Sequence, residues 1–129
     1  MLVSSIPQYI QGLTNAKLLL TTTDATVLYT APSGAEANSS VISSILVHEH
    51  SNNSDTVRVF ITDINNNIFE MFDETVAGHA TTELLTRDLV LQAGESISMQ
   101  AGTANRIHVV ASIQELIKTR ITTSAISQI

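Results

Sequence analysis

The sequence contains no cysteine and no tryptophan, and its aromatic residues are only two tyrosines and three phenylalanines. Without cysteine, the chain cannot form disulfides, thiolate zinc sites, iron–sulfur clusters or a cysteine nucleophile. The scarcity of aromatic rings argues against a stacking platform for single-stranded nucleic acid. A net charge of −6, from six Lys and Arg against twelve Asp and Glu, would also repel a phosphate backbone. We therefore expect no nucleic-acid partner.

Long apolar runs and a basic leader are also missing. No apolar run approaches the roughly 20 residues that span a bilayer, so no membrane partner is expected. Residues 1–13 carry no basic residue and are interrupted by Pro7, unlike a signal peptide. The 129 residues have the length of one domain, with 43% apolar and only 14% charged residues. This balance predicts a well-filled core and further buried surface, which copies of the same chain would cover most simply.

Short alternating runs of β-branched and apolar residues are separated by Gly, Asn, Asp and Pro, which is typical of strands and turns. Strands are predicted at residues 18–22, 26–30, 39–50, 56–62, 68–76, 82–91, 96–100 and 106–115. About eight short, regularly spaced strands predict an all-β protein, a single-domain antiparallel β-sandwich or jelly roll. The sandwich is expected over 17–115, with an N-terminal arm over 1–16 and a C-terminal arm or extra edge strand over 116–129.

Alternation assigns the side chains of each strand to two faces. One face has a consistent apolar set, predicted to form the core: Ile45, Val47, Val57, Val59, Ile61, Ile97, Met99, Ile107, Val109, Ala111 and Ile113. The opposite face is also partly apolar, which predicts a subunit contact. Its candidate residues are Ile42, Leu46, His48, Phe60 and Val110. The alternative is that two packed sheets need apolar residues on both phases, and the pattern leaves both interpretations open.

His48-Glu49-His50 is the segment that looks most like a chemical site. Two histidines at i and i+2 of a strand point the same way, as a two-histidine metal site requires. A third ligand would have to come from another element, and the candidates are His79, His108 and Asp55. The favoured interpretation is a polar strand end entering the loop 51–55, so no metal or cofactor is predicted.

Two acidic segments resemble functional sites only superficially. The loop 63–67 is rich in Asp and Asn but lacks the glycine and glutamate of a calcium-binding EF-hand, which favours a hairpin turn. Glu70, Asp73 and Glu74 alternate between the faces of one strand, as on an exposed edge, and do not form a glycosidase pair. The sequence has no phosphate-binding glycine loop, nucleophile elbow or H-E-x-x-H helix, so we predict that the protein is not an enzyme.

Four segments together resemble small structural proteins of tailed bacteriophages. Residues 27–34, VLYTAPSG, and 41–47, VISSILV, are similar to the opening of those proteins. Residues 89–97, LVLQAGESI, resemble the turn before their final strands, and 106–112, RIHVVAS, their closing strand. The resemblance covers about residues 18–115. This sequence departs from the pattern conservatively, at Ser33, Glu95 and Ile113.

The resemblance implies a virion component with a β-sandwich or jelly-roll fold, commonly oligomeric and often threefold. We expect a capsid decoration (cement) protein on the capsid surface. Its partners would be itself, as a homotrimer, and the phage major capsid protein or other virion proteins. The alternatives are a tail, neck or baseplate adaptor or fibre protein, including a receptor-binding one, and a metal-dependent adaptor that uses His48 and His50. On this interpretation the terminal arms latch onto the capsid or a neighbouring subunit through Leu2, Ile6, Tyr9, Ile10, Ile117, Ile121 and Ile126.

Overall fold

The computed structural model describes residues 8–34 and 37–118, and these residues form nine strands. The strands are β1 (Gln8–Leu19), β2 (Thr26–Thr30), β3 (Ala37–Glu49), β4 (Asp55–Thr62), β5 (Ile68–Val76), β6 (Thr81–Glu83), β7 (Leu89–Gln92), β8 (Ser96–Ala101) and β9 (Ile107–Lys118). Among these residues there is no helix long and apolar enough to cross a membrane.

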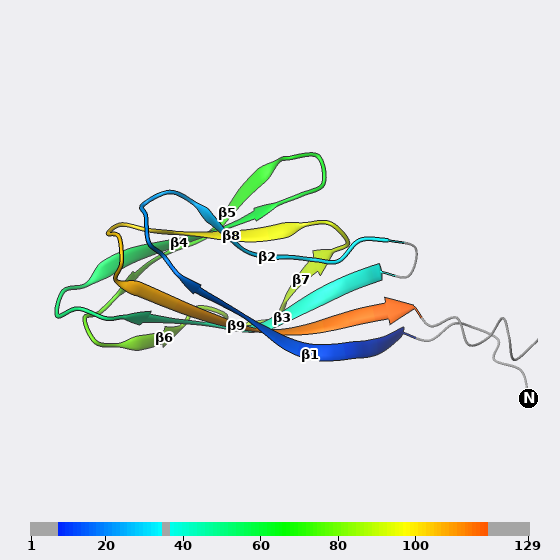
Figure 1. Cartoon of the computed structure of the whole chain (residues 1–129), viewed down its shortest axis with the longest axis horizontal. Coiled ribbons are helices and arrows are strands. Elements are labelled where there is room, and N and C mark those ends of the chain that lie inside the picture. The colour runs from blue at the N-terminus through cyan, green and yellow to red at the C-terminus, as the bar shows by residue number, and fades with distance from the viewer. Residues whose placement is uncertain (1–7, 35–36, 119–129) are drawn as a thin grey trace, which may run out of the picture.

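The strands form two antiparallel sheets packed face to face (Figure 1). The larger sheet has the order β1-β9-β3-β6, with β7 also paired to β3, and the smaller sheet has the order β2-β8-β4-β5. The pairing is nested: β1 pairs with β9, β2 with β8, β3 with β6 and β7, and β4 with β5. Nested antiparallel pairs shared between two sheets define a jelly roll. The predicted all-β sandwich is confirmed.

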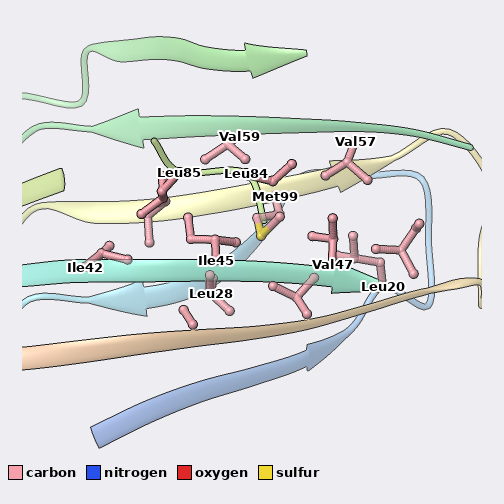
Figure 2. Packing of buried hydrophobic residues seen from close by; sticks show 14 of the residues in the cluster. Leu20, Leu28, Ile42, Ile45, Val47, Val57, Val59, Leu84, Leu85 and Met99 are labelled. Carbon is pink, nitrogen blue, oxygen red and sulfur yellow. The ribbon is translucent and has the colours of Figure 1, made fainter. Parts of the chain in front are cut away.

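The core lies between the two sheets, where their inward side chains interdigitate (Figure 2). The predicted inward set is buried in the structure, except that Ile61 is only partly buried and packs against the edge of the core. Three further leucines complete the core: Leu20 just after β1, Leu28 of β2 and Leu91 of β7. Because burial of apolar area is the main favourable contribution to folding, this layer holds the two sheets together.

The first strand begins ten residues earlier than the sequence pattern predicts, at Gln8 instead of Leu18. Residues 8–16, expected in an N-terminal arm, instead pair with β9 in a long antiparallel ribbon that runs from Gln8↔Lys118 to Leu19↔His108. The pattern misses this stretch because β1 is an edge strand of the larger sheet and its side chains at 13–15 are exposed. An edge strand in contact with solvent need not alternate between apolar and polar residues.

The predicted arm residues fall into two groups. Tyr9 and Ile117 are paired with each other across β1 and β9, and Ile10 is paired with Leu116, so these positions belong to the sheet. β9 itself extends to Lys118, three residues beyond the predicted last strand. The other predicted arm residues lie outside the described residues: Leu2, Ile6, Ile121 and Ile126.

The predicted strand 82–91 is divided into β6 and β7, which pair with different parts of β3. Between them, the Glu83 carboxylate accepts hydrogen bonds from the Ser44 hydroxyl and from the backbone N–H groups of Ile45 (2.7 Å) and Leu85 (3.1 Å). The Leu84 N–H donates to the Ile45 carbonyl at 2.9 Å. A side chain therefore takes the place of strand pairing where β3 would otherwise have an unpaired backbone donor.

A polar contact joins the two sheets through Tyr29 of β2. Its hydroxyl donates to Glu115 Oε2 of β9 at 2.5 Å and lies 2.9 Å from Ser40 Oγ of β3. Burial, together with the adjacent Glu115 carboxylate, raises the pKa of Tyr29 to about 12. The neutral hydroxyl is therefore the form that the fold stabilises.

We expect the stability of the protein to fall between pH 10 and 12 because of Tyr29. Its folded pKa of about 12 lies above the ordinary value of 10.0. Its contribution is therefore complete below pH 10 and is lost as the pH rises through 12. Tyr29→Phe should cost about 1 kcal/mol at pH 7 from the lost hydrogen bonds. Urea unfolding at pH 7 and 11 measures both effects, and equal alkaline destabilisation of wild type and Tyr29→Phe would contradict the assignment.

Glu83→Ala should lower the free energy of unfolding by about 1–2 kcal/mol, because two backbone donors lose their acceptor. Glu74→Ala removes a carboxylate of the same type from an exposed position and is the matched control, with an expected change within about 0.5 kcal/mol. Urea denaturation of both variants at pH 7 measures the difference. Equal stabilities would show that Glu83 does not support β3.

Candidate assembly surface

The outer face of the larger sheet carries a mixed patch of apolar and histidine side chains. Two neighbouring rows of cross-strand pairs form it, and alternation directs both away from the core. In one row His48 lies beside His108, which lies beside Leu19; in the other, Leu46 lies beside Val110. The Leu46 and Val110 residues are 41% and 38% exposed. We call these five residues the histidine face.

A shallow groove runs along the part of the histidine face where β1 meets β9. It is lined by Lys17, Leu18, Leu19, His108, Val109 and Val110. Lys17, paired with Val110, borders the face on one side, and Glu83, paired with Leu46, borders it on the other. A centre of apolar and histidine side chains with charged residues at its margin is the usual composition of a protein–protein contact.

Three imidazole rings gather at one end of this face. The His108 ring centroid lies 6.4 Å from that of His48 and 5.6 Å from that of His50. His48 of β3 and His50, the residue that follows β3, lie on the same side of the chain, as the sequence predicts, while the intervening Glu49 points into the core. The His48 Nδ1 is 2.8 Å from the Thr81 hydroxyl, so one ring nitrogen is already engaged.

The side chains around the three imidazoles were compared with the arrangement that a metal ion needs. Within residues 8–34 and 37–118, no three His, Cys, Asp or Glu side chains are arranged to hold a metal ion. Two of the proposed third ligands have other contacts: His79 Nε2 is 2.5 Å from Asn52 Oδ1, and Asp55 accepts from the backbone of Thr56 and Thr103. The geometry favours hydrogen bonding and packing by these rings.

Ile42 does not belong to the histidine face, contrary to the sequence prediction. It is fully buried in the core. The reason is a register shift between β3 and β9 at Ile42/Ser44, where an extra residue changes the phase of the strand. Ser40 and Ile42 point inward before the shift, and Ile45 points inward after it.

Phe60 is also misplaced by the prediction. It lies on β4, in the smaller sheet, and its neighbours Val59 and Ile61 belong to or pack against the core. Phe60 therefore points to the outer side of the smaller sheet, on the opposite side of the sandwich from Leu46 and Val110. One flat contact cannot include both sides, so the predicted interface is reduced to Leu46, His48 and Val110.

The loop at 63–67 is a hairpin turn organised by Asp63. Its carboxylate accepts hydrogen bonds from the backbone N–H groups of Asn65 and Asn67, both at 2.9 Å, and Asn66 has a positive φ of 65°. The hydrogen bonds from Asn67 and Asn65 lower the pKa of Asp63. This is the turn that the sequence favours over a calcium loop.

Comparison with known proteins adds information about the fold. No family model and no curated protein matches the chain. Among solved structures, the chain is similar to one from Bacillus endospore appendages, described as disulfide-linked pili, with a TM-score of 0.52 and 10% identity over 88% of both chains. At such low identity, this similarity shows a shared fold and nothing further.

Two weaker similarities were found. The Clostridium thermocellum xylanase 10B structure, containing CBM22-1 and GH10 modules complexed with xylohexaose, gives a TM-score of 0.45 at 7% identity over 89% of this chain and 26% of that chain. The T13 particle of infectious bursal disease virus (IBDV) gives 0.39 at 13% identity over 83% of this chain and 31% of that one. At these scores, neither similarity bears on function.

The sequence pattern alone does not identify Leu19 as a member of the histidine face. It places Leu19 in the first strand without assigning the residue to a side. The cross-strand neighbour His108 identifies its position, and that register depends on the long β1–β9 pairing. The Tyr29–Glu115 contact is missed for a similar reason, because its partners are 86 residues apart in the sequence.

Two substitutions on β3 test which side each residue occupies. Ile42→Ala should lower the free energy of unfolding by about 2–5 kcal/mol, because it leaves a cavity in a fully buried site. Leu46→Ala, four residues along the same strand and partly exposed, should change it by about 0.5 kcal/mol or less in the monomer. Denaturant unfolding at low protein concentration provides the measurement. A similar loss in both variants would contradict the register shift.

Proposed function

We propose that this protein is a non-enzymatic structural subunit of a tailed-phage virion, and specifically a capsid decoration protein that assembles with copies of itself. The single observation that carries the proposal is the histidine face, an apolar and histidine patch on the outside of an otherwise complete sandwich. The resemblance of residues 18–115 to small phage structural proteins supplies the biological setting.

The composition of the histidine face suits contact with another copy. Leu19, Leu46 and Val110 provide exposed apolar area on adjacent strands, and burial of that area would favour association. In a cyclic trimer, residues nearest the symmetry axis meet the same residues of the other copies. His48 and His108 would then lie close to their counterparts, where ring stacking and hydrogen bonds can form.

A decoration protein acts through many identical weak contacts, and the composition of this chain is compatible with non-covalent contacts of that kind. It has no cysteine, so its copies cannot be joined by disulfides in the way of the disulfide-linked pili of Bacillus endospores. Its assembly must therefore depend on buried area and hydrogen bonds, whose contributions add up over many copies on a particle. This mechanism needs no catalytic residue.

Immunogold labelling of intact phage particles tests the location. With an antibody raised against the purified protein, gold spread over the head would support the decoration role. Gold confined to the neck or tail tip would overturn it in favour of the adaptor or fibre role. Absence of label on particles that contain the protein by mass spectrometry would place it inside the virion and contradict both surface roles.

Val110→Asp tests the role of the histidine face, because a carboxylate buried in a contact is strongly unfavourable. The variant should lower the oligomeric mass measured by sedimentation velocity. Val27→Asp, on exposed β2 of the other sheet, is the matched control and should leave the mass unchanged. An unchanged mass for Val110→Asp, with circular dichroism showing a folded protein, would exclude the face as the subunit contact.

A further inference from the structure

Strand β5 is a long free edge of the smaller sheet. It has nine residues, and within the described part of the chain it pairs only with β4. An edge strand offers a row of backbone donors and acceptors to which another strand can add. Native edges are commonly protected by lysine or proline, and β5 contains neither.

The side chains of β5 are unusually exposed for a strand with apolar residues. Phe69 is 52% exposed, and Ile68 and Met71 are exposed as well. Glu74 lies on the inward phase, opposite the buried Val57, and is nevertheless exposed. On the same inward side, Val76 is fully buried and Phe72 packs against the core, so the exposure of β5 is greatest at its first residues, where the β4–β5 hairpin projects away from the larger sheet (Figure 1).

The side chains of β5 carry a net negative charge. Glu70, Asp73 and Glu74 lie on the strand, which has no lysine or arginine of its own. The neighbouring Arg58 of β4 forms ion pairs with Glu70 at 3.9 Å and Asp73 at 3.4 Å. Three carboxylates against one guanidinium leave the edge negative, which favours a basic strand as its partner.

The chain contains a segment with the complementary composition. Residues 119–129, TRITTSAISQI, follow β9 and lie outside the described residues. They contain Arg120 and no acid, follow directly after Lys118, and are rich in Thr and Ile, which favour strands. At about 3.3 Å per residue, these residues would extend over about 36 Å, enough to cover the roughly 30 Å of β5.

The direction of the chain favours a segment from a second copy. β5 begins beside the end of β4, which lies beside the start of β8, through the pairs Ile68↔Thr62 and Thr62↔Ser96. β8 runs to the other end of the sandwich, and β9 returns from there. β9 therefore ends, at Lys118, at the end of the sandwich where β5 begins (Figure 1).

A segment that left β9 and continued along β5 of its own copy would run parallel to β5. A segment from another copy can approach from the opposite end and pair antiparallel, which is the more stable pairing in this otherwise antiparallel sheet. The other long edge, β1, is a poorer acceptor for a basic segment because it carries Lys17 and no acidic residue, whereas β5 carries three; each strand has one register shift with its neighbour.

We propose that β5 accepts residues 119–129 of a second copy of this chain as an additional antiparallel strand, so that copies are joined by exchanged C-terminal segments. The exchange goes beyond the proposed contact at the histidine face, because it lies on the other sheet and needs neither that face nor a capsid.

Cysteine cross-linking tests the exchange directly, because the natural chain has no cysteine. A chain with Thr75→Cys on β5 is produced together with a mass-tagged chain that carries Ser124→Cys, and the mixture is oxidised gently. A disulfide between the two different chains is expected. In the control, Thr30→Cys, on β2 at the opposite edge of the same sheet, replaces Thr75→Cys. This pair should form at least tenfold less disulfide-linked product.

The outcomes of this experiment are distinct. Equal cross-linking at Thr30→Cys and Thr75→Cys, or none at either, overturns the proposal. A chain that carries both Thr75→Cys and Ser124→Cys should form dimers; a product containing only internal disulfides would show that the segment covers its own β5, and would also overturn it.

A charge exchange in the full chain gives an independent measurement. Glu74→Lys or Arg120→Glu alone should raise the dissociation constant of the oligomer about fivefold, and the double variant should recover most of the loss. Asp88→Lys makes the same charge change at an exposed site away from β5 and is the control. Additive losses in the double variant would contradict the pairing. If the charge variants leave the dissociation constant unchanged while Val110→Asp still lowers the oligomeric mass, the strand exchange is excluded and the contact at the histidine face is retained.

Discussion

The register of β3 is the constraint on which the rest of the structure depends. β3 lies between β9 on one edge and β6 and β7 on the other. Its register therefore determines which side chains at the centre of the larger sheet face the core and which face outward. The shift at Ile42/Ser44 changes that phase once. It places Ile42 and Ile45 inward although they are three residues apart, a spacing that regular alternation would assign to opposite faces.

On its other edge β3 has a gap in its pairing that Glu83 fills. β7 pairs with residues 39–42 and β6 with residues 46–48, so the backbone N–H of Ile45 between them has no strand partner, and a backbone donor without an acceptor is costly. The Glu83 carboxylate supplies the acceptor for Ile45 and, through Leu85, also fixes the chain between β6 and β7. The division of the predicted strand 82–91 is therefore compensated by a side-chain carboxylate, which keeps the centre of β3 hydrogen-bonded on that edge.

The fold could be predicted from the sequence because strand alternation and turn residues are local properties. The hairpin at 63–67 and the core residues of β8 and β9 follow from their neighbours in the sequence. The position of Ile42 could not be predicted, because a bulge depends on the partner strand. The extent of β1 cannot be predicted from alternation, because this edge strand has polar, exposed residues such as Thr14 and Asn15.

The phase of β3 also connects the core with the histidine face. Because His48 and His50 point outward, Glu49 between them must point inward, where it is fully buried. Its Oε1 accepts the Ser51 N–H at 2.6 Å, which orders the loop after β3, while its Oε2 has no hydrogen-bond partner among residues 8–34 and 37–118. A buried carboxylate in a partly satisfied state is unfavourable for folding. Alternation allows no other arrangement: moving Glu49 to the surface would place both histidines in the core. The buried carboxylate is therefore a consequence of the same phase of β3 that places Ile45 and Val47 in the core and the two histidines outside it.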